Sequence, residues 1–319
     1  MDAARLREQI LNFPKQLEAG LEVVNADRLI KTDKFILCGL GGSALAGGLM
    51  KVYNPELDLL IHRDYGLPRV PRYFLEGALL ILSSYSGETE EVLDTLAAVM
   101  SRGLKAAVIA GGGTLLEEAK RLRLPYVVLP AGWLPRLAVG HSFTGLAKLI
   151  RDDKIIPGLA LAREALNLTA SESAGKKLSV WLDGKLTIIY ASTVNLHLAY
   201  YWKICLNETG KTAAFFNVLP EMNHNELAAA DPHFGYIFLR DTADHPRIKH
   251  RFDRLSEMFE GRGLAVTEVI LSGRSPLEKI FHSVLLANWT AYHLALAAQR
   301  DPAATPVIEE FKKLIKSDV

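Results

Sequence analysis

The sequence predicts an α/β protein of two domains, each built on a parallel sheet covered by helices. The chain has 319 residues, which is more than one hydrophobic core usually fills. Short, continuous apolar runs alternate with helix-patterned segments over residues 34–129, and the alternation begins again after residue 150. Runs of this kind between helices are typical of parallel strands that are buried on both faces. We therefore expect one domain over residues 1–150 and another over 151–319.

The first domain is expected to open with a helical segment. Residues 2 to about 30 carry apolar side chains at helical spacing, and Pro14 must kink or split the segment. The elements that follow are expected as strands at 34–39, 58–62, 77–83, 105–110 and 125–129, and as helices at 43–53, 89–101 and 115–122.

The second domain repeats this alternation. Residues 151–154 and 171–177 are its least structured-looking segments. The last helix is expected to start at Pro306, because proline is well suited to a first helical turn. The expected elements are strands at 186–190, 236–240 and 265–271, and helices at about 193–208, 246–261, 277–298 and 306–316.

Composition excludes several classes of protein. A net charge of +1 gives no electrostatic reason to expect nucleic acid or an anionic membrane as a partner. No apolar run reaches the length of a membrane span, and the first residues do not resemble a secretory signal. Cys38 and Cys205 lie in apolar runs and are expected to be buried thiols. A cytoplasmic enzyme is the simplest interpretation.

A glycine-rich loop follows the first expected strand. Gly39-Leu40-Gly41-Gly42-Ser43-Ala44 opens a helix, which directs backbone N–H groups and the positive end of the helix dipole at an anion. The string also fits G-x-G-x-x-A, and Asp64 lies at a suitable distance for a dinucleotide fingerprint. A nicotinamide-dependent oxidoreductase is therefore a competing hypothesis.

A second polar loop follows the strand that ends at Ser83. In Ser84-Tyr85-Ser86-Gly87-Glu88-Thr89, three hydroxyls can donate to phosphate oxygens, and Gly87 lets the backbone approach a ligand. The plain alternative is a polar strand-to-helix cap. Two such loops in one sheet favour a small phosphomonoester over a dinucleotide.

Acid–base residues follow in the second half, in Asn207-Glu208-Thr209-Gly210-Lys211 and in Pro220-Glu221-Met222-Asn223-His224-Asn225-Glu226. Glutamate and histidine move protons near neutral pH because their pKa values can be tuned towards it. Taken alone, Glu208 could be a surface charge and His224 a turn residue. Arg136, in an otherwise apolar stretch after Pro135, needs an anionic partner.

These motifs together resemble one family. Gly41-Gly42-Ser43 with the Ser84–Thr89 loop is similar to the phosphosugar-binding signature of sugar isomerase (SIS) domains. The whole chain resembles the bifunctional phosphoglucose/phosphomannose isomerases through Pro135-Arg136, Asn207-Glu208, Asn223–Glu226 and residues 306–312. The resemblance implies two doubly wound, flavodoxin-like SIS domains, a homodimer, and no cofactor or metal.

The resemblance also implies roles for single residues. Glu208 would shuttle a proton between C1 and C2 of a hexose 6-phosphate, and His224, from the partner subunit, would assist ring opening. Arg136 would lie near the enediolate and Lys312 on the ring-opening side. The substrate-binding residues implied are Gly41, Gly42, Ser43, Ser84, Ser86 and Thr89 for the phosphate, and Thr305, which leaves room for either C2 epimer.

The sequence departs from the family pattern at Glu88, where asparagine is usual, at Ala44, where glycine is common, and at Ala213, where proline is common. His141 also follows the arginine loop at an unusual place. The expected activity is interconversion of glucose 6-phosphate and mannose 6-phosphate with fructose 6-phosphate through a cis-enediolate. A second hypothesis is an SIS protein that senses a phosphosugar without turning it over.

Overall fold

The computed structural model describes residues 2–18, 20–152 and 154–317, and the chain forms two compact units. The six-stranded unit contains Asn12–Leu166 and Gly273–Phe281. The four-stranded unit contains Met1–Leu11, Asn167–Ser272 and His282–Val319. Helix α11 (Pro276–Ala297) thus contributes its first turns to one unit and the remainder to the other. The expected domains 1–150 and 151–319 stay a prediction.

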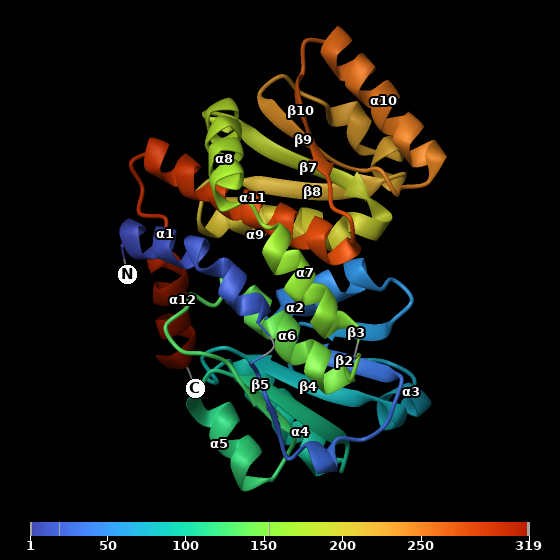
Figure 1. The fold of residues 1–319 in the computed structure, drawn as a ribbon, viewed down its shortest axis with the longest axis vertical. Coiled ribbons are helices and arrows are strands. Elements are labelled where there is room, and N and C mark those ends of the chain that lie inside the picture. Colours follow the sequence, from blue (N-terminus) through green and yellow to red (C-terminus); the bar gives the residue numbers. More distant parts are fainter. Residues whose placement is uncertain (1, 19, 153, 318–319) are drawn as a thin grey trace. The chain divides into compact units, whose positions relative to one another are not determined.

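The six-stranded sheet has the order β1-β6-β5-β4-β2-β3, and Figure 1 labels its strands β5, β4, β2 and β3. Its last five strands are parallel, and β1 pairs antiparallel with β6. The strands are β1 (Val23–Val24), β2 (Lys34–Cys38), β3 (Asp58–His62), β4 (Leu79–Ser84), β5 (Lys105–Ala110) and β6 (Tyr126–Val128). Taken in chain order, the parallel strands follow the doubly wound sequence 2-1-3-4-5, as predicted.

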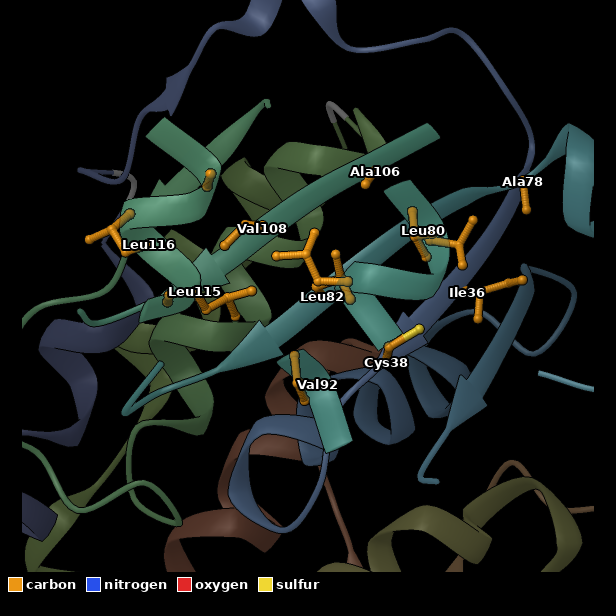
Figure 2. Packing of buried hydrophobic residues seen from close by; sticks show 14 of the residues in the cluster. Ile36, Cys38, Ala78, Leu80, Leu82, Val92, Ala106, Val108, Leu115 and Leu116 are labelled. Carbon is orange, nitrogen blue, oxygen red and sulfur yellow. The ribbon is translucent and has the colours of Figure 1, made fainter. Parts of the chain in front are cut away.

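Helices cover both faces of this sheet. On one face, α4 and α5 pack on Ile36, Cys38, Leu80, Leu82 and Val108, whose side chains alternate along their strands (Figure 2). On the other face, α2 and α6 approach the strands closely through glycines. The helices are α2 (Gly42–Tyr53), α3 (Arg72–Gly77), α4 (Glu90–Ser101), α5 (Gly113–Arg121), α6 (Val139–Ile150) and α7 (Ile155–Ala165).

The four-stranded sheet is entirely parallel, in the order β10-β9-β7-β8. The strands are β7 (Leu186–Ser192), β8 (Ala214–Leu219), β9 (Phe234–Asp241) and β10 (Ala265–Leu271). An aromatic cluster that includes Tyr236, Phe238, Phe252 and Phe259 packs α10 (Pro246–Gly261) on one face. The other helices that lie wholly in this unit are α1 (Ala3–Leu11), α8 (Leu168–Leu182), α9 (Leu196–Glu208) and α12 (Pro306–Ser317).

Two expectations were wrong. The helix expected to about residue 30 ends at Leu11, as α1. It is followed by a 3₁₀ turn (Phe13–Leu17) with Pro14 near its start, and then by β1 and a second 3₁₀ turn (Ala26–Arg28). Residues 171–177 are helical, inside α8, because Asn167 Oδ1 caps that helix at Ala170 N (3.0 Å). Strand β8 is also new, since the sequence offered no expectation for residues 214–219.

Within the described part of the chain, no helix combines the length and the apolar character needed to cross a membrane.

Candidate active site

The two loops predicted to bind phosphate lie together at the topological switch point of the six-stranded sheet. Strands β2 and β4 are neighbours, and the strand order reverses between them. In doubly wound sheets, ligands bind outside the carboxyl ends of the strands at this point. The loop after β2 contains Gly41–Ser43, and the loop after β4 contains Tyr85–Thr89. We call these residues, together with Ser84, the cradle.

Hydrogen bonds join the two loops of the cradle. Ser43 Oγ accepts from the backbone N–H of Tyr85 at 3.0 Å, and Ser83 Oγ donates to the carbonyl of Ser43 at 3.2 Å. Within the second loop, Ser84 Oγ lies 2.7 Å from Thr89 Oγ1 and 3.5 Å from Ser86 Oγ. The structure therefore brings together all four hydroxyls that the sequence predicted for phosphate.

Two helix N-termini open at the cradle. Helix α2 begins at Gly42 after Gly41, and α4 begins at Glu90 after Thr89. Thr89 directs its hydroxyl to Ser84 and does not cap α4. The backbone N–H groups of a first turn and the positive end of the helix dipole both favour an anion. The cradle thus combines two helix dipoles with hydroxyl donors.

Glycines allow the backbone approaches that form this site. A Cβ at Gly42 would lie 2.5 Å from the carbonyl oxygen of Pro135 and 2.8 Å from the backbone nitrogen of Arg136. The start of α2 therefore packs directly on the Pro135-Arg136 peptide. Gly87 has φ +74°, and a Cβ there would lie 1.8 Å from the carbonyl oxygen of Gly112. Neither position has room for a side chain.

Arg136 is thereby held against the first loop of the cradle. Its residue is only 5% exposed. The preceding segment is braced by Tyr85, whose hydroxyl donates to the carbonyl of Pro130 at 2.8 Å and accepts from the N–H of Trp133 at 2.9 Å. A buried guanidinium stays cationic and does not exchange protons. The backbone of Arg136 therefore lies against the first loop of the cradle, and its expected place near the enediolate stays a prediction.

His141 lies in the first turn of α6, five residues after Arg136. Its ring meets the Trp133 ring edge-on with centroids 5.4 Å apart, and its backbone N–H donates to Gln16 Oε1 at 3.2 Å. Burial lowers the pKa of His141 to about 4. The imidazole is consequently neutral at physiological pH and adds no charge beside Arg136.

Glu88, the departure that adds a negative charge to the loop, has a structural role. Its Oε1 accepts from the backbone N–H of Thr114 at 2.7 Å, and both carboxylate oxygens accept from Thr114 Oγ1, at 3.1 and 3.0 Å. Thr114 is in the first turn of α5. The carboxylate thus caps that helix, where its charge is favourable to the dipole. The other two departures are a buried Ala44 in α2 and Ala213 just before β8.

Glu208, in the four-stranded unit, is the last residue of α9 and is half-buried. The neighbouring Asn207 accepts the N–H of Ala214 on its Oδ1 at 2.9 Å, which fixes the end of the helix to the start of β8. A helix that connects two parallel strands runs opposite to them. Glu208 therefore lies at the amino-terminal edge of the sheet.

His224 ends a 3₁₀ turn (Glu221–His224) that follows β8. Its neighbours are anchored: Met222 is fully buried, Asn223 Oδ1 accepts from Arg251 Nη1 at 3.1 Å, and Glu226 Oε1 accepts from Asn217 Nδ2 at 2.5 Å. His224 itself is exposed. The surrounding contacts thus hold the loop while the imidazole is presented outward.

Glu208 and His224 of one chain are not brought together in the four-stranded unit. Strand β8 (Ala214–Leu219) runs between them, with Glu208 at the edge where it begins and His224 at the edge where it ends. Six residues of parallel strand span roughly 17–20 Å. A proton-transfer site that uses both side chains cannot be built from this unit alone.

Thr305 and Lys312 belong to the same unit as Glu208. Thr305 is half-buried, and its carbonyl accepts the N–H of Glu309 in the first turn of α12. Lys312 is exposed on that helix. The segment before Thr305 is tied to the end of α9, because Lys211 Nζ donates to the carbonyl of Glu208 at 2.5 Å and also to that of Ala304. Thr305 therefore lies on the same edge as Glu208.

Comparison with known proteins defines the family. Residues 171–315 match the bacterial phospho-glucose isomerase C-terminal SIS domain. The chain is 32% identical to a bifunctional phosphoglucose/phosphomannose isomerase of Caldicellulosiruptor bescii, with 96% of this chain and 97% of the relative covered. This chain belongs to the bifunctional phosphoglucose/phosphomannose isomerase family. A second member, from Aquifex aeolicus, is 30% identical over 88% of this chain and 90% of its own.

Solved structures show the same fold. The tagatose-6-phosphate ketose/aldose isomerase of Escherichia coli superposes with a TM-score of 0.72 at 16% identity and covers 94% of each chain. The α/β fold of two SIS-type domains that the sequence predicts is thereby confirmed. Among residues 2–18, 20–152 and 154–317, no group of three or more His, Cys, Asp or Glu side chains is arranged to hold a metal ion.

Two groups in this isomerase-family chain were missed by sequence reasoning. Tyr85 stands between two predicted phosphate-binding serines, but its role as a brace depends on a carbonyl 45 residues away. Lys211 follows Glu208 within the motif that drew attention to the glutamate, and nothing in the sequence indicates that its ammonium reaches Ala304. Both roles depend on contacts that are distant in sequence.

Proposed function

We propose that this protein is an aldose–ketose isomerase that interconverts glucose 6-phosphate and mannose 6-phosphate with fructose 6-phosphate. The observation that carries the proposal is the cradle itself: four hydroxyls and two helix N-termini converge beside a buried arginine. Such a site suits a phosphate monoester with a second, anion-forming group nearby. Family membership supports the same class of reaction.

The proposed reaction moves one proton from C2 to C1 and another from the C2 oxygen to the C1 oxygen, and it leaves the oxidation state of the whole sugar unchanged. Glu208 removes the proton from C2 of the open-chain aldose, and the electrons form a C1–C2 double bond as the C1 carbonyl becomes an enediolate oxygen. The same carboxyl returns the proton to C1, and the proton of the C2 hydroxyl passes to the C1 oxygen, so that C1 carries a hydroxyl and C2 becomes the ketose carbonyl. Arg136 stabilises the enediolate charge without taking part in proton transfer.

Acceptance of two C2 epimers follows from this chemistry. Glucose and mannose 6-phosphates give the same enediolate, because C2 is planar once its proton has left. The enzyme then needs space for either orientation of the C2 hydroxyl in the aldose. We assign this space to the small side chain of Thr305, on the same edge as Glu208.

We further propose that the working site is shared between two subunits of a homodimer. Within one four-stranded unit, the whole length of β8 separates Glu208 from His224. A second copy related by a two-fold axis can supply the missing imidazole, and the symmetry then builds two identical sites. His224 would assist ring opening there, with Lys312 near the ring oxygen.

The test is the variant Glu208→Gln, assayed by a coupled measurement of glucose 6-phosphate formed from fructose 6-phosphate. Removal of a general base typically lowers turnover by about 10²–10⁴-fold, while the neutral amide preserves shape and substrate binding. Glu260→Gln, an exposed substitution at the end of α10, is the matched control and should keep full activity. Near-normal turnover by Glu208→Gln would show that the base is another group.

The same assay separates the two rival hypotheses. A phosphosugar sensor would bind fructose 6-phosphate without forming product, and an oxidoreductase would require a nicotinamide cofactor for any conversion.

Both thiols are free and buried, and a cytoplasmic setting without nucleic-acid or membrane partners remains our expectation.

A further inference from the structure

In the four-stranded unit, the segments that follow helices α9 and α11 are far apart in the sequence but are joined by hydrogen bonds. Helix α9 ends at Glu208 and is followed by Lys211, whose φ is +56°. Helix α11 ends at Ala297 and is followed by Gln299, whose φ is +54°, and then by Arg300. Lys211 and Arg300 each reach across to the other segment. We call this pair the clamp.

The clamp consists of three bonds from cationic donors to backbone carbonyls. Lys211 Nζ donates to the carbonyl of Glu208 at 2.5 Å and to the carbonyl of Ala304. Arg300 Nη1 donates to the carbonyl of Lys211 at 2.6 Å. Bonds from charged donors are about twice as strong as neutral ones. Residues 208–211 and 300–304 are therefore joined by one hydrogen bond from Lys211 to Ala304 and another from Arg300 to Lys211.

The bond to Glu208 completes the end of α9. The last four carbonyls of a helix have no partner within the helix. Here the carbonyl of Cys205 accepts from the N–H groups of Thr209 and Gly210, and that of Leu206 accepts from the N–H of Thr212. The ammonium of Lys211 serves the carbonyl of Glu208 itself. The backbone that carries the proposed base is thus fixed by this side chain.

The backbone conformation of Lys211 indicates that the position needs a side chain. A left-handed residue after a helix is usually glycine, because any other residue costs about 1 kcal/mol or more in that conformation. Lysine gains nothing from the conformation, so its presence is explained by the two carbonyls that its ammonium reaches. Glycine would relieve the backbone and remove the bonds.

We propose that Lys211 and Arg300 are positioning residues that hold the Thr305–Lys312 segment in register with Glu208. Ala304 precedes Thr305 directly, and α12, which carries Lys312, starts at the next residue. The clamp therefore links the proposed base, the epimer-tolerant residue and the ring-opening lysine. The inference rests on the proposed function, because it concerns how that site keeps its geometry. A displacement of about 1 Å at such a site costs on the order of 10²-fold in rate.

The experiment compares Lys211→Gly, Lys211→Met, Lys211→Arg and Arg300→Met in the full-length protein. We expect the glycine and methionine variants to lose about 10- to 100-fold in kcat, with KM for fructose 6-phosphate changed less than about threefold. Lys211→Gly should unfold at the same temperature as the wild type or higher, because it removes the left-handed strain. Lys211→Arg, which can still donate to both carbonyls, should recover most of the lost kcat.

A second readout does not depend on catalysis. Hydrogen–deuterium exchange of peptides over residues 300–317 should rise in Lys211→Gly and Arg300→Met and remain low in Lys211→Arg, while peptides of α10 stay unchanged. Wild-type kcat in Lys211→Gly, or unchanged exchange over residues 300–317, would overturn the clamp. If Lys211→Gly lowers kcat and the unfolding temperature and also raises KM, the clamp is likewise overturned, because the role of Lys211 would then be general stability. If Glu208→Gln stays active while the exchange changes as expected, Glu208 is not the base and the clamp stands. If the wild type forms no product from fructose 6-phosphate while the exchange changes as expected, the proposed function fails and the clamp stands.

Discussion

At the scale of the residue, the absence of a side chain at Gly42 decides where Arg136 lies. The first turn of α2 can touch the Pro135-Arg136 peptide only because no Cβ stands 2.5 Å from the Pro135 carbonyl. This single close contact joins the first loop of the cradle to Arg136, the residue that we propose stabilises the enediolate. Tyr85 braces the segment that precedes this contact, at Pro130 and Trp133.

We therefore predict that Gly42→Ala lowers kcat/KM for fructose 6-phosphate by at least about 10-fold and lowers the free energy of unfolding by about 1–3 kcal/mol, the usual cost of overpacking. Steady-state kinetics and urea denaturation measure the two effects. Gly261→Ala is the control, because a Cβ at that position meets nothing within 4 Å. An alanine variant at Gly42 with normal kinetics would mean that the Arg136 loop can move without consequence.

His141 makes a prediction about pH. Burial lowers its folded-state pKa to about 4, whereas an unfolded histidine titrates near 6.5. Between these values the unfolded chain binds more protons, so stability rises with pH across this window. The contribution is present above about pH 6.5 and is lost as the pH falls towards 4.

We expect His141→Gln to flatten the dependence of the free energy of unfolding on pH between 6.5 and 4, by roughly 1–3 kcal/mol in total. Urea denaturation at several pH values measures the slope for the variant and the wild type. His250→Gln, on the exposed surface of α10, should leave the slope unchanged. Equal slopes for His141→Gln and the wild type would show that the ring titrates normally in the folded protein.

At the scale of the element, helix termini organise the cradle. Helices α2 and α4 leave their N-termini open to an anion, whereas α5 is capped by Glu88 through Thr114. The difference separates the anion-binding role that we propose for α2 and α4 from the structural role of Glu88 in capping α5. It also explains how the loop accommodates a carboxylate where the family usually has asparagine.

Glu88→Ala should accordingly lower the free energy of unfolding by about 1 kcal/mol, the usual cost of losing a helix cap, while KM for fructose 6-phosphate changes less than about twofold. Denaturation and steady-state kinetics on the same preparation compare the two effects. Glu117→Ala removes only an exposed ion pair with Lys120 on α5 and should cost less. A large gain in affinity on removing Glu88 would instead show that its charge opposes the phosphate.

At the scale of the whole molecule, the separation of Glu208 from His224 by β8 predicts shared sites. Glu208→Gln and His224→Ala subunits should each be inactive alone. In a mixed dimer, one site carries both lesions and the other carries neither. Random mixing makes half of the dimers mixed, so about a quarter of the wild-type activity should return.

Co-expression of two differently tagged subunits, followed by purification through both tags, isolates the mixed dimer, which has one intact site of two and should show about half of the wild-type activity. Mixed Glu208→Gln and Glu260→Gln subunits provide a control for the effect of the tags. If the isolated mixed dimer stays inactive, each chain supplies its own histidine, and the shared-site proposal is wrong.

Much of the fold follows from the sequence because local patterns determine it. The strands at 58–62 and 105–110 contain short apolar runs, and the structure places β3 and β5 at those residues. The helix expected to about residue 30 was wrong, because apolar spacing persists there while Pro14 and a left-handed Asn25 interrupt the backbone. The spacing of apolar residues indicates which face of a helix would be buried, but it says less about the residue at which the helix ends.

The candidate site follows from the sequence only in part. The hydroxyl-rich loops could be predicted because the ends of their strands can be read from the sequence. The carboxyl ends of neighbouring parallel strands lie at the same edge of a sheet, so the loops that follow them lie close together. The brace of Tyr85, the cap of Glu88 and the bond from Lys211 to Ala304 were not visible, since each joins residues 26 to 93 positions apart. The sequence by itself determined which residue types the site contains and the alternation of strands and helices that makes the fold α/β. Only the tertiary structure decided that Glu208 and His224 lie at opposite edges of one sheet, because that separation depends on the direction of β8 in space.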